Sequence, residues 1–252
     1  MKIVSAAITD VGKKREINED NFYISKDDGL YLLADGMGGH LAGDMASKLA
    51  VDTIASFIKS TGVDREVTWP YRRDEKLPYE ANRLIIAIKF ANKKIFNVAK
   101  EKELTGMGTT VASLLFHGEN VYLCHVGDSR AYRIRNGKIA QLTEDHSLLN
   151  FTMKTNPMTT EEIENFPFKN VITRAIGIEE DVEVDMNVEQ ISEGDYYLLC
   201  SDGLSNFVSD EQIVDTVVKG KKDLLKACKG LISHANNKGG GDNITVVLTH
   251  VE

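Results

Sequence analysis

Residues 30–40 have the sequence LYLLADGMGGH, in which an apolar run ends at Asp35 and three glycines follow within four residues. The run before it, NFYIS at 21–25, is separated from it by KDDG, which is a turn signal between two strands. The sequence YYLLCSDGL at 196–204 has the same pattern, in which an apolar run is followed by Asp-Gly. These stretches predict buried strands that carry a carboxylate at one end.

Outward from this hairpin, the other expected elements come in groups. Apolar residues at three-to-four spacing predict two long helices in the first half of the chain. Ser209 and Gln212 have capping-box spacing, which predicts that a further helix begins there. The expected helices are 46–58, one from Tyr79, one from Ser209 and 221–237, and the expected loop is 60–78. The expected strands are 3–10, 21–25, 30–34, 109–116, 120–127, 130–137, 138–143, 182–189, 196–201 and 243–251.

The grouping of these elements indicates the fold class. Helices come in pairs rather than alternating with single strands, which favours an α+β fold with antiparallel sheets over a doubly wound α/β fold. We find no internal repeat or linker, and we expect residues 1–252 to form one domain. The segment 145–170 has two prolines and one short helix signal, Thr159 with Glu162, and we expect it to be mostly irregular.

Composition narrows the class of protein and its partners. The 252 residues are 42% hydrophobic and 27% charged, with a formal net charge of −8. This balance is typical of a globular protein, and it does not favour a nucleic-acid or membrane partner. No segment has the length of a membrane span or of a signal peptide. The chain has three cysteines and no Cys-x-x-Cys pair, and Cys124 and Cys200 each lie in an apolar run, which predicts buried free thiols in a reducing cytoplasm.

Carboxylates recur beside the predicted strand ends. Asp35 and Asp202 end apolar runs, and Asp128 and Asp242 lie next to others. The sequence REINED at 15–20 places Glu19 and Asp20 directly before a strand. A single Asp-Gly is more often a turn, and for Asp35 alone a turn is favoured. The combination favours a site for Mg²⁺ or Mn²⁺, because clustered carboxylates repel unless a cation neutralises them.

Two other interpretations of these motifs are disfavoured. The glycines of GMGGH do not fit a dinucleotide-binding loop, because Leu41 occupies the position of the last glycine, and no Walker lysine is present. Zinc is disfavoured because the sequence lacks a His-x-x-x-His or a cysteine pair.

Eight segments, in order, resemble the metal-dependent serine/threonine phosphatases of the protein phosphatase 2C family in their bacterial form. These segments are REINED (15–20), ADGMGGHLAGDMAS (34–47), GMGTTVAS (106–113), HVGDSRAYRI (125–134), LTEDHS (142–147), ITRAIG (172–177), LLCSDGL (198–204) and GGGDNITVV (239–247). The resemblance implies a four-layer α-β-β-α sandwich of two antiparallel β-sheets flanked by paired helices.

The resemblance also implies a metal centre at one end of the sandwich. In the family pattern, two core metals, Mg²⁺ or Mn²⁺, share one bridging aspartate, and bacterial members carry a third. The resemblance implies that Asp35 bridges the two core metals and that the carbonyl of Gly36 binds one of them, while Asp202 and Asp242 bind the other. Glu19 would act through metal-bound water, with Asp20 beside it. Asp128 and Asp202 would bind the third metal.

The implied activity is hydrolysis of phosphoserine and phosphothreonine in proteins. A metal-bridging water or hydroxide attacks phosphorus directly, while Arg15 holds the substrate phosphate.

Eukaryotic members have a histidine directly after the Asp-Gly, which is the proposed general acid. In this sequence Met37 occupies that position, so a metal-bound water is the alternative acid. We expect His40 to bond near the helix start and His146 to be structural. A nucleophilic Cys200 is disfavoured, because it lacks a phosphate-binding loop before an arginine.

The resemblance extends to partners and to a flap. We expect phosphorylated protein substrates, an opposing serine/threonine kinase and a monomer. The segment 145–170 lies where bacterial members carry a mobile flap beside the active site, although it could equally be a passive surface loop. Two other functions remain open: a pseudophosphatase that only binds a partner, and a metal-dependent esterase of small phosphates. Retention of Arg15 and of all the acidic residues argues against the first.

Overall fold

The computed structural model describes residues 1–39, 41–64, 68–220 and 223–252. Its strands form two sheets in which every pair of neighbouring strands is antiparallel. The first sheet has the order β1 (Ile3–Asp10), β11 (Ile244–Val251), β10 (Tyr196–Cys200), β7 (Arg130–Arg135) and β8 (Lys138–Gln141). The second has the order β2 (Asp20–Ser25), β3 (Leu30–Met37), β5 (Val111–His117), β6 (Asn120–Val126) and β9 (Asp185–Gln190), with β4 (Gly108–Thr109) paired to β3.

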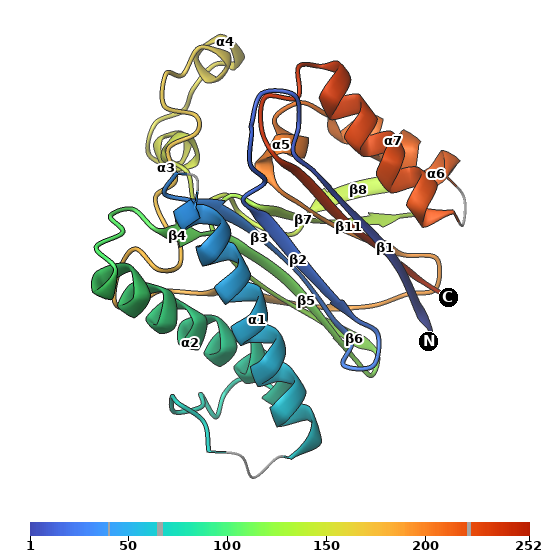
Figure 1. Ribbon diagram of the computed structural model, residues 1–252. Helices are drawn as coiled ribbons and strands as arrows, with labels where there is room; N and C mark the ends of the chain where they lie inside the picture. Colours follow the sequence, from blue (N-terminus) through green and yellow to red (C-terminus); the bar gives the residue numbers. More distant parts are fainter. Residues whose placement is uncertain (40, 65–67, 221–222) are drawn as a thin grey trace.

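Helices cover the outer face of each sheet (Figure 1). The second sheet packs against α1 (Leu41–Val63) and α2 (Tyr79–Glu101), and the first against α6 (Asp210–Lys219) and α7 (Leu224–Asn237). At one end lie the short α5 (Asp202–Ser205) and the loop from β1 to β2, and α3 (Leu148–Thr155) and α4 (Thr160–Glu164) extend beyond the sheets. The predicted four-layer α-β-β-α sandwich is therefore confirmed.

Three hydrophobic layers explain why the strands are apolar on both faces. In β3, Leu30 and Leu32 pack against α1 and α2, whereas Tyr31 and Leu33 point between the sheets. In β10, Leu198 faces α6 and α7 while its neighbours Tyr197 and Leu199 point inward. Successive side chains of a strand point to opposite faces, so a strand between two covered faces must be apolar throughout. The continuous apolar runs predicted as buried strands have this cause.

Most predicted elements are present with boundaries that differ by a few residues, such as β3, which ends at Met37, and β9, which begins at Asp185, and two helices were not predicted. The helix predicted to end at Ile58 continues to Val63, where Thr61 is buried and its hydroxyl donates to the carbonyl of Phe57 at 2.8 Å. In the segment expected to be mostly irregular, the structure adds α3, whose N-cap Ser147 accepts a hydrogen bond from the Asn150 amide. Helix α5 directly after β10 was also not predicted.

The remaining predictions about elements and thiols can be stated briefly. Both predicted capping boxes, at Thr159 and Ser209, are present, and all three cysteines are free and buried. Within the described ranges, no helix combines the length and apolar character needed to cross a membrane. His40, residues 65–67 of the predicted loop and residues 221–222 of the predicted last helix lie outside the described residues.

Candidate metal centre and phosphate site

The acidic residues meet because five strands begin or end at the same end of the sandwich. Strands β3, β6 and β10 end there, and β2 and β11 begin there. Asp20, the first residue of β2, lies directly opposite Asp35 near the end of β3, so both side chains project from the same face of the sheet. Asp128 follows β6, Asp202 follows β10, and Asp242 precedes β11.

Burial and neighbouring negative charges raise the pKa of four aspartates at this end. Burial raises the pKa of Asp20 and of Asp128 to about 7, and that of Asp202 to about 6. The pKa of Asp35 lies well above its usual value because of burial first, and then because of the charges of Asp20, Asp202, Asp128 and Asp242. Cations bound beside such a cluster would favour the ionised form of its carboxylates at neutral pH.

The donor atoms suit a hard divalent cation. All of these side chains offer carboxylate oxygens, which Mg²⁺ and Mn²⁺ prefer. Oδ2 of Asp20 accepts hydrogen bonds from Thr245 at 2.7 Å and Ser201 at 2.9 Å, whereas its buried Oδ1 has no hydrogen-bond partner within the described chain. Two hydroxyls therefore orient Asp20 and leave one oxygen for another ligand. Ser201 and Thr245 were not predicted as site residues, although each lies within three residues of a predicted ligand.

Asn243 fixes the loop that carries Arg15 and Glu19. Its Oδ1 accepts the Glu19 amide at 2.9 Å, and its Nδ2 donates to the carbonyls of Val11 and Ile17, both at 3.0 Å. Asn243 is buried, at 4% exposure, and it joins the chain start to β11 more than 220 residues away. The sequence analysis singled out Asp242 and missed its neighbour, although both belong to the matching segment GGGDNITVV.

Arg15 lies at the rim of the acidic cluster. Its Nη2 binds Oδ2 of Asp242 at 2.8 Å, and its side chain is 48% exposed. This hydrogen bond is the main reason that the pKa of Arg15 is raised. The residue thus places a permanent positive charge between the carboxylates and solvent, where a phosphate group can reach it.

Gly36 is required by close packing at the start of α1. A Cβ atom on Gly36 would lie 2.2 Å from the carbonyl oxygen of Gly43 and 2.6 Å from that of Glu19. The amide of Gly36 also donates to the Glu19 carbonyl at 3.2 Å. The glycine therefore lets the first turn of α1 and the end of the β1–β2 loop approach the strand beside Asp35.

Comparison with known proteins identifies the family. The protein phosphatase 2C family model matches residues 12–238. The chain belongs to the protein phosphatase 2C family of metal-dependent serine/threonine phosphatases. It is 39% identical to the serine/threonine phosphatase stp of Listeria welshimeri over 248 residues, covering 95% of this chain and 92% of the relative. It is 38% identical to protein phosphatase PhpP of Streptococcus pneumoniae over 244 residues, covering 96% and 94%.

Solved structures agree with this family assignment. The Mycobacterium tuberculosis serine/threonine phosphatase PstP/Ppp is 35% identical, with a TM-score of 0.87 and full coverage of both chains. A catalytic domain of PstP in complex with two manganese ions is 34% identical, with a TM-score of 0.82 and 99% coverage of each chain. The predicted Mg²⁺ or Mn²⁺ dependence is thereby confirmed for the family.

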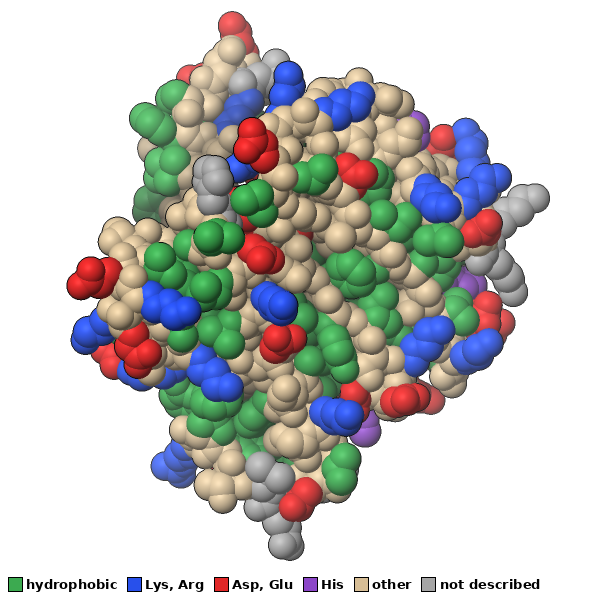
Figure 2. Space-filling model, in the orientation of Figure 1, with side chains coloured by type: hydrophobic (Ala, Val, Ile, Leu, Met, Phe, Trp, Pro, Cys, Tyr) green, Lys and Arg blue, Asp and Glu red, His purple; other side chains and the backbone are tan. Residues whose placement is uncertain are grey.

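Two hollows of this phosphatase lie beside the loop that follows Gly36. A hollow of about 350 Å³ is lined by Arg15 and Glu19 together with Lys14 and Gly39. A larger one, of about 540 Å³, is lined by Met37 and Arg174, with Glu179, Asp181 and Glu183 around it. A substrate that reaches the carboxylates therefore has room on both sides of the loop that follows Gly36. The face shown in Figure 2 mixes acidic and basic side chains and shows no continuous basic surface.

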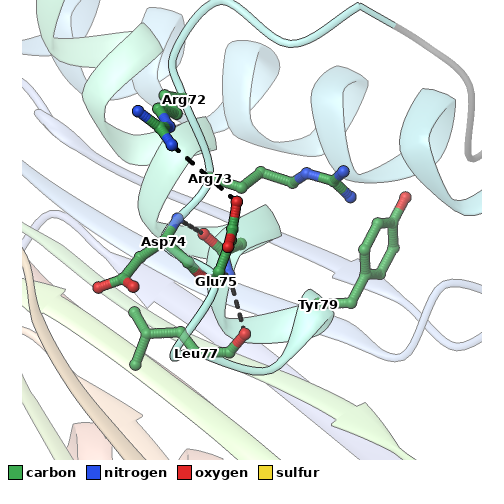
Figure 3. Close-up of a pocket in the computed structure, with 7 residues that line it drawn as sticks. Arg72, Arg73, Asp74, Glu75, Leu77 and Tyr79 are labelled. Carbon is green, nitrogen blue, oxygen red and sulfur yellow. Dashed lines mark hydrogen bonds and ion pairs between the residues drawn. The ribbon is translucent and has the colours of Figure 1, made fainter.

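A third hollow lies apart from these residues, in the connection between α1 and α2. It has a volume of about 300 Å³, and Arg73 extends there toward Tyr79 (Figure 3). The Arg73 guanidinium lies 5.2 Å from the ring centre of Trp69 and 6.0 Å from that of Tyr79. None of the predicted site residues of the phosphatase lines this hollow. We attribute its shape to the packing of this connection.

A second titratable cluster of the phosphatase lies beside Asp128. The possible metal-ligand atoms of His125, His146 and Asp185 lie within 4.8 Å of one another, which is close enough for one metal ion to bind all three. The guanidinium of Arg174 already lies among them, 2.5 Å from Asp185, and the Gly127 amide donates to Nδ1 of His146. A neutral His146 then carries its proton on Nε2 and cannot offer that nitrogen to a metal. These contacts of His146 and Asp185 are thus made to protein groups, and the structural role expected for His146 stays a prediction.

Proposed function

We propose that the residues at the strand ends carry out direct hydrolysis of phosphoserine and phosphothreonine in proteins. Water attacks phosphorus, the bond from phosphorus to the seryl or threonyl oxygen breaks, and inorganic phosphate and the free alcohol are the products. The observation that supports this is the convergence of five aspartates, of which Asp35 has a pKa raised by burial and by the charges of the other four, beside one partly exposed arginine. Cys200 would not act as a nucleophile, because it is buried and burial raises its pKa to about 12.

We assign the metal ligands residue by residue. Asp35 and the carbonyl of Gly36 would hold the two core metals together with Asp202 and Asp242, and Asp128 would hold a third with Asp202. Glu19 and Asp20, buried at 8% and 4% exposure, would support the centre through hydrogen-bonded water. Mg²⁺ or Mn²⁺ bound there would supply positive charge to the phosphoryl oxygens and activate water for attack.

Arg15 would bind the substrate phosphate. Its guanidinium is bound to one oxygen of Asp242, and its remaining donors lie toward solvent at the hollow shared with Lys14. A guanidinium can donate two parallel hydrogen bonds to phosphate oxygens, which orients the phosphorus relative to the carboxylates.

The wider role follows from this activity. We propose that residues 1–252 form a single catalytic domain, with about 145–170 as a flap beside the active site, and that the phosphatase works as a monomer in the cytoplasm. There it would reverse signalling by a serine/threonine kinase. The position of α3 and α4 beyond the sheets, at the end where the carboxylates lie, supports the flap assignment.

Hydrolysis of a phosphothreonine peptide, with Mn²⁺ and with EDTA, tests the proposal. We expect Mn²⁺-dependent release of phosphate from the peptide. No release by the metal-loaded protein would overturn the activity and favour the pseudophosphatase. A kcat/KM for a small aryl phosphate above that for the phosphopeptide would favour the small-phosphate esterase instead.

A further inference from the structure

One side chain from a distant segment holds the turn that carries Asp128. The amide of Gly127 donates to Nδ1 of His146 at 3.0 Å, and the amide of His146 donates back to the carbonyl of Gly127, also at 3.0 Å. Both residues are buried, and Gly127 has a φ of +108°, which favours glycine. Asp128 is the next residue, so its placement depends on this pair of hydrogen bonds.

The other nitrogen of His146 faces two charged side chains. Its Nε2 lies 3.3 Å from Oδ2 of Asp185 and 3.0 Å from Nη1 of Arg174. Because Nδ1 accepts a hydrogen bond, the neutral ring carries its proton on Nε2 and donates it to Asp185. The ring also stacks on His125, with centroids 4.8 Å apart. The orientation of His146 is therefore fixed from three sides.

The backbone of His146 belongs to the base of the proposed flap. Its carbonyl accepts the amide of Thr173 at 2.8 Å, and the next residue, Ser147, forms a β-bridge with Ile172. These contacts close the segment that contains α3 and α4. His146 thus touches the Asp128 turn through its side chain and the two ends of the flap through its backbone.

We infer that His146 is a positioning residue, which sets the Asp128 turn for the third metal and couples that turn to the base of the flap. The inference rests on the proposed function of Asp128. It requires an acceptor toward Gly127 and a donor toward Asp185 on opposite sides of one side chain, and histidine supplies both. Asparagine can place Oδ1 near the position of Nδ1, but its shorter amide does not carry the NH2 donor as far as the position of Nε2, and leucine has neither group. His146→Asn should therefore behave between the parent and His146→Leu.

The first test uses metal-free protein and does not depend on activity. Amide hydrogen exchange measured by NMR should show that His146→Leu speeds exchange at Gly127 about 10-fold, roughly the loss of one hydrogen bond, with partial restoration in His146→Asn. The matched control is His117→Leu, whose side chain is 57% exposed at the end of β5. Unchanged exchange at Gly127 in His146→Leu would overturn the inference, and if that variant does not fold, unchanged exchange in His146→Ala, which also lacks the acceptor, would do so.

The second test asks whether His146 acts through Asp128. In the parent, His146→Leu should lower kcat about 10–100-fold, as expected for a residue that orients a metal ligand. In an Asp128→Ala background the same change should lower kcat less than about twofold, because coupled residues are not additive. Equal losses in both backgrounds would show a general structural role. If the parent releases no phosphate, the proposed function fails, while the exchange experiment still decides the contact of His146.

Discussion

At the scale of single residues, Asp35 serves the sheet and the site through different atoms. Its backbone is part of the sheet, where its carbonyl accepts the Thr110 amide at 2.9 Å and its amide donates to the Thr110 hydroxyl at 3.1 Å. Its carboxylate faces the other aspartates, which raise its pKa. The backbone bonds remain when the carboxylate is changed, so the site can be altered without loss of the strand.

Asp35→Asn should therefore abolish turnover while the protein still folds. We expect kcat to fall by more than about 100-fold, a larger loss than the substitution of a residue that only orients a metal ligand. Phosphopeptide hydrolysis with saturating Mn²⁺ measures this, and circular dichroism reports the fold. The matched control, Asp27→Asn, lies exposed in the turn between β2 and β3 and should leave kcat unchanged. Parent-like turnover of Asp35→Asn would refute the ligand assignment.

Cys200 lies two residues before the predicted ligand Asp202, but we expect it to take no part in the reaction. It is completely buried within the layer between the first sheet and α6–α7, and burial raises its pKa to about 12. Cys200→Ala should keep kcat within about twofold of the parent, because no bond to phosphorus is lost. The free energy of unfolding should fall by about 1 kcal/mol from the lost packing. A folded but inactive variant would restore the cysteine-nucleophile interpretation.

At the scale of elements, the loop from β1 to β2 depends on Asn243 at the start of β11. Asn243→Ala would leave the Glu19 amide and two carbonyls without their partner. We expect the free energy of unfolding in urea to fall by about 2–4 kcal/mol, since each buried unpaired group costs about 1–3 kcal/mol. Turnover should fall as well, because Arg15 and Glu19 lie on this loop. The exposed Asn97→Ala on α2 is the control and should change neither quantity.

The elements also show where local pattern is informative. The β2–β3 hairpin, the two long helices and both capping boxes follow from apolar spacing and turn chemistry, and the sequence analysis predicted them. Helix α3 escaped prediction because none of its residues is buried. Its apolar residues at helical spacing extend over only eight residues, and its cap bond from Asn150 to Ser147 gives a weaker signal than a capping box.

At the scale of the whole molecule, the fold encloses more negative charge at one end than it can neutralise alone. Asp128 has a folded pKa of about 7, above the usual value near 3.8, so its charge opposes folding increasingly as pH rises through that interval. Burial lowers the pKa of His125 and His146, which acts in the opposite sense on stability. A comparison of variants therefore isolates the contribution of Asp128.

In EDTA, Asp128→Asn should raise Tm, and by more at pH 8 than at pH 6, where Asp128 of the parent is mostly protonated. A gain of about 1 kcal/mol corresponds to about 2–4 °C in a chain of this size. With Mn²⁺, the parent should gain Tm, more so at pH 8, because metal ligands must be deprotonated. Thermal denaturation at both pH values measures this, with Asp27→Asn as control. An equal effect of Asp128→Asn at both pH values would contradict the shifted pKa.

The sequence by itself determined the order of the elements, the burial of strands on both faces and the aspartates that mark strand ends. These features are local, because apolar spacing and turn residues act within a few positions of the chain. Only the tertiary structure decided that Asp20 lies opposite Asp35, that Asn243 holds Glu19 and that His146 holds Gly127. Such contacts depend on which strands pair, as β1 does with β11 at the two ends of the chain, and no local pattern specifies that pairing.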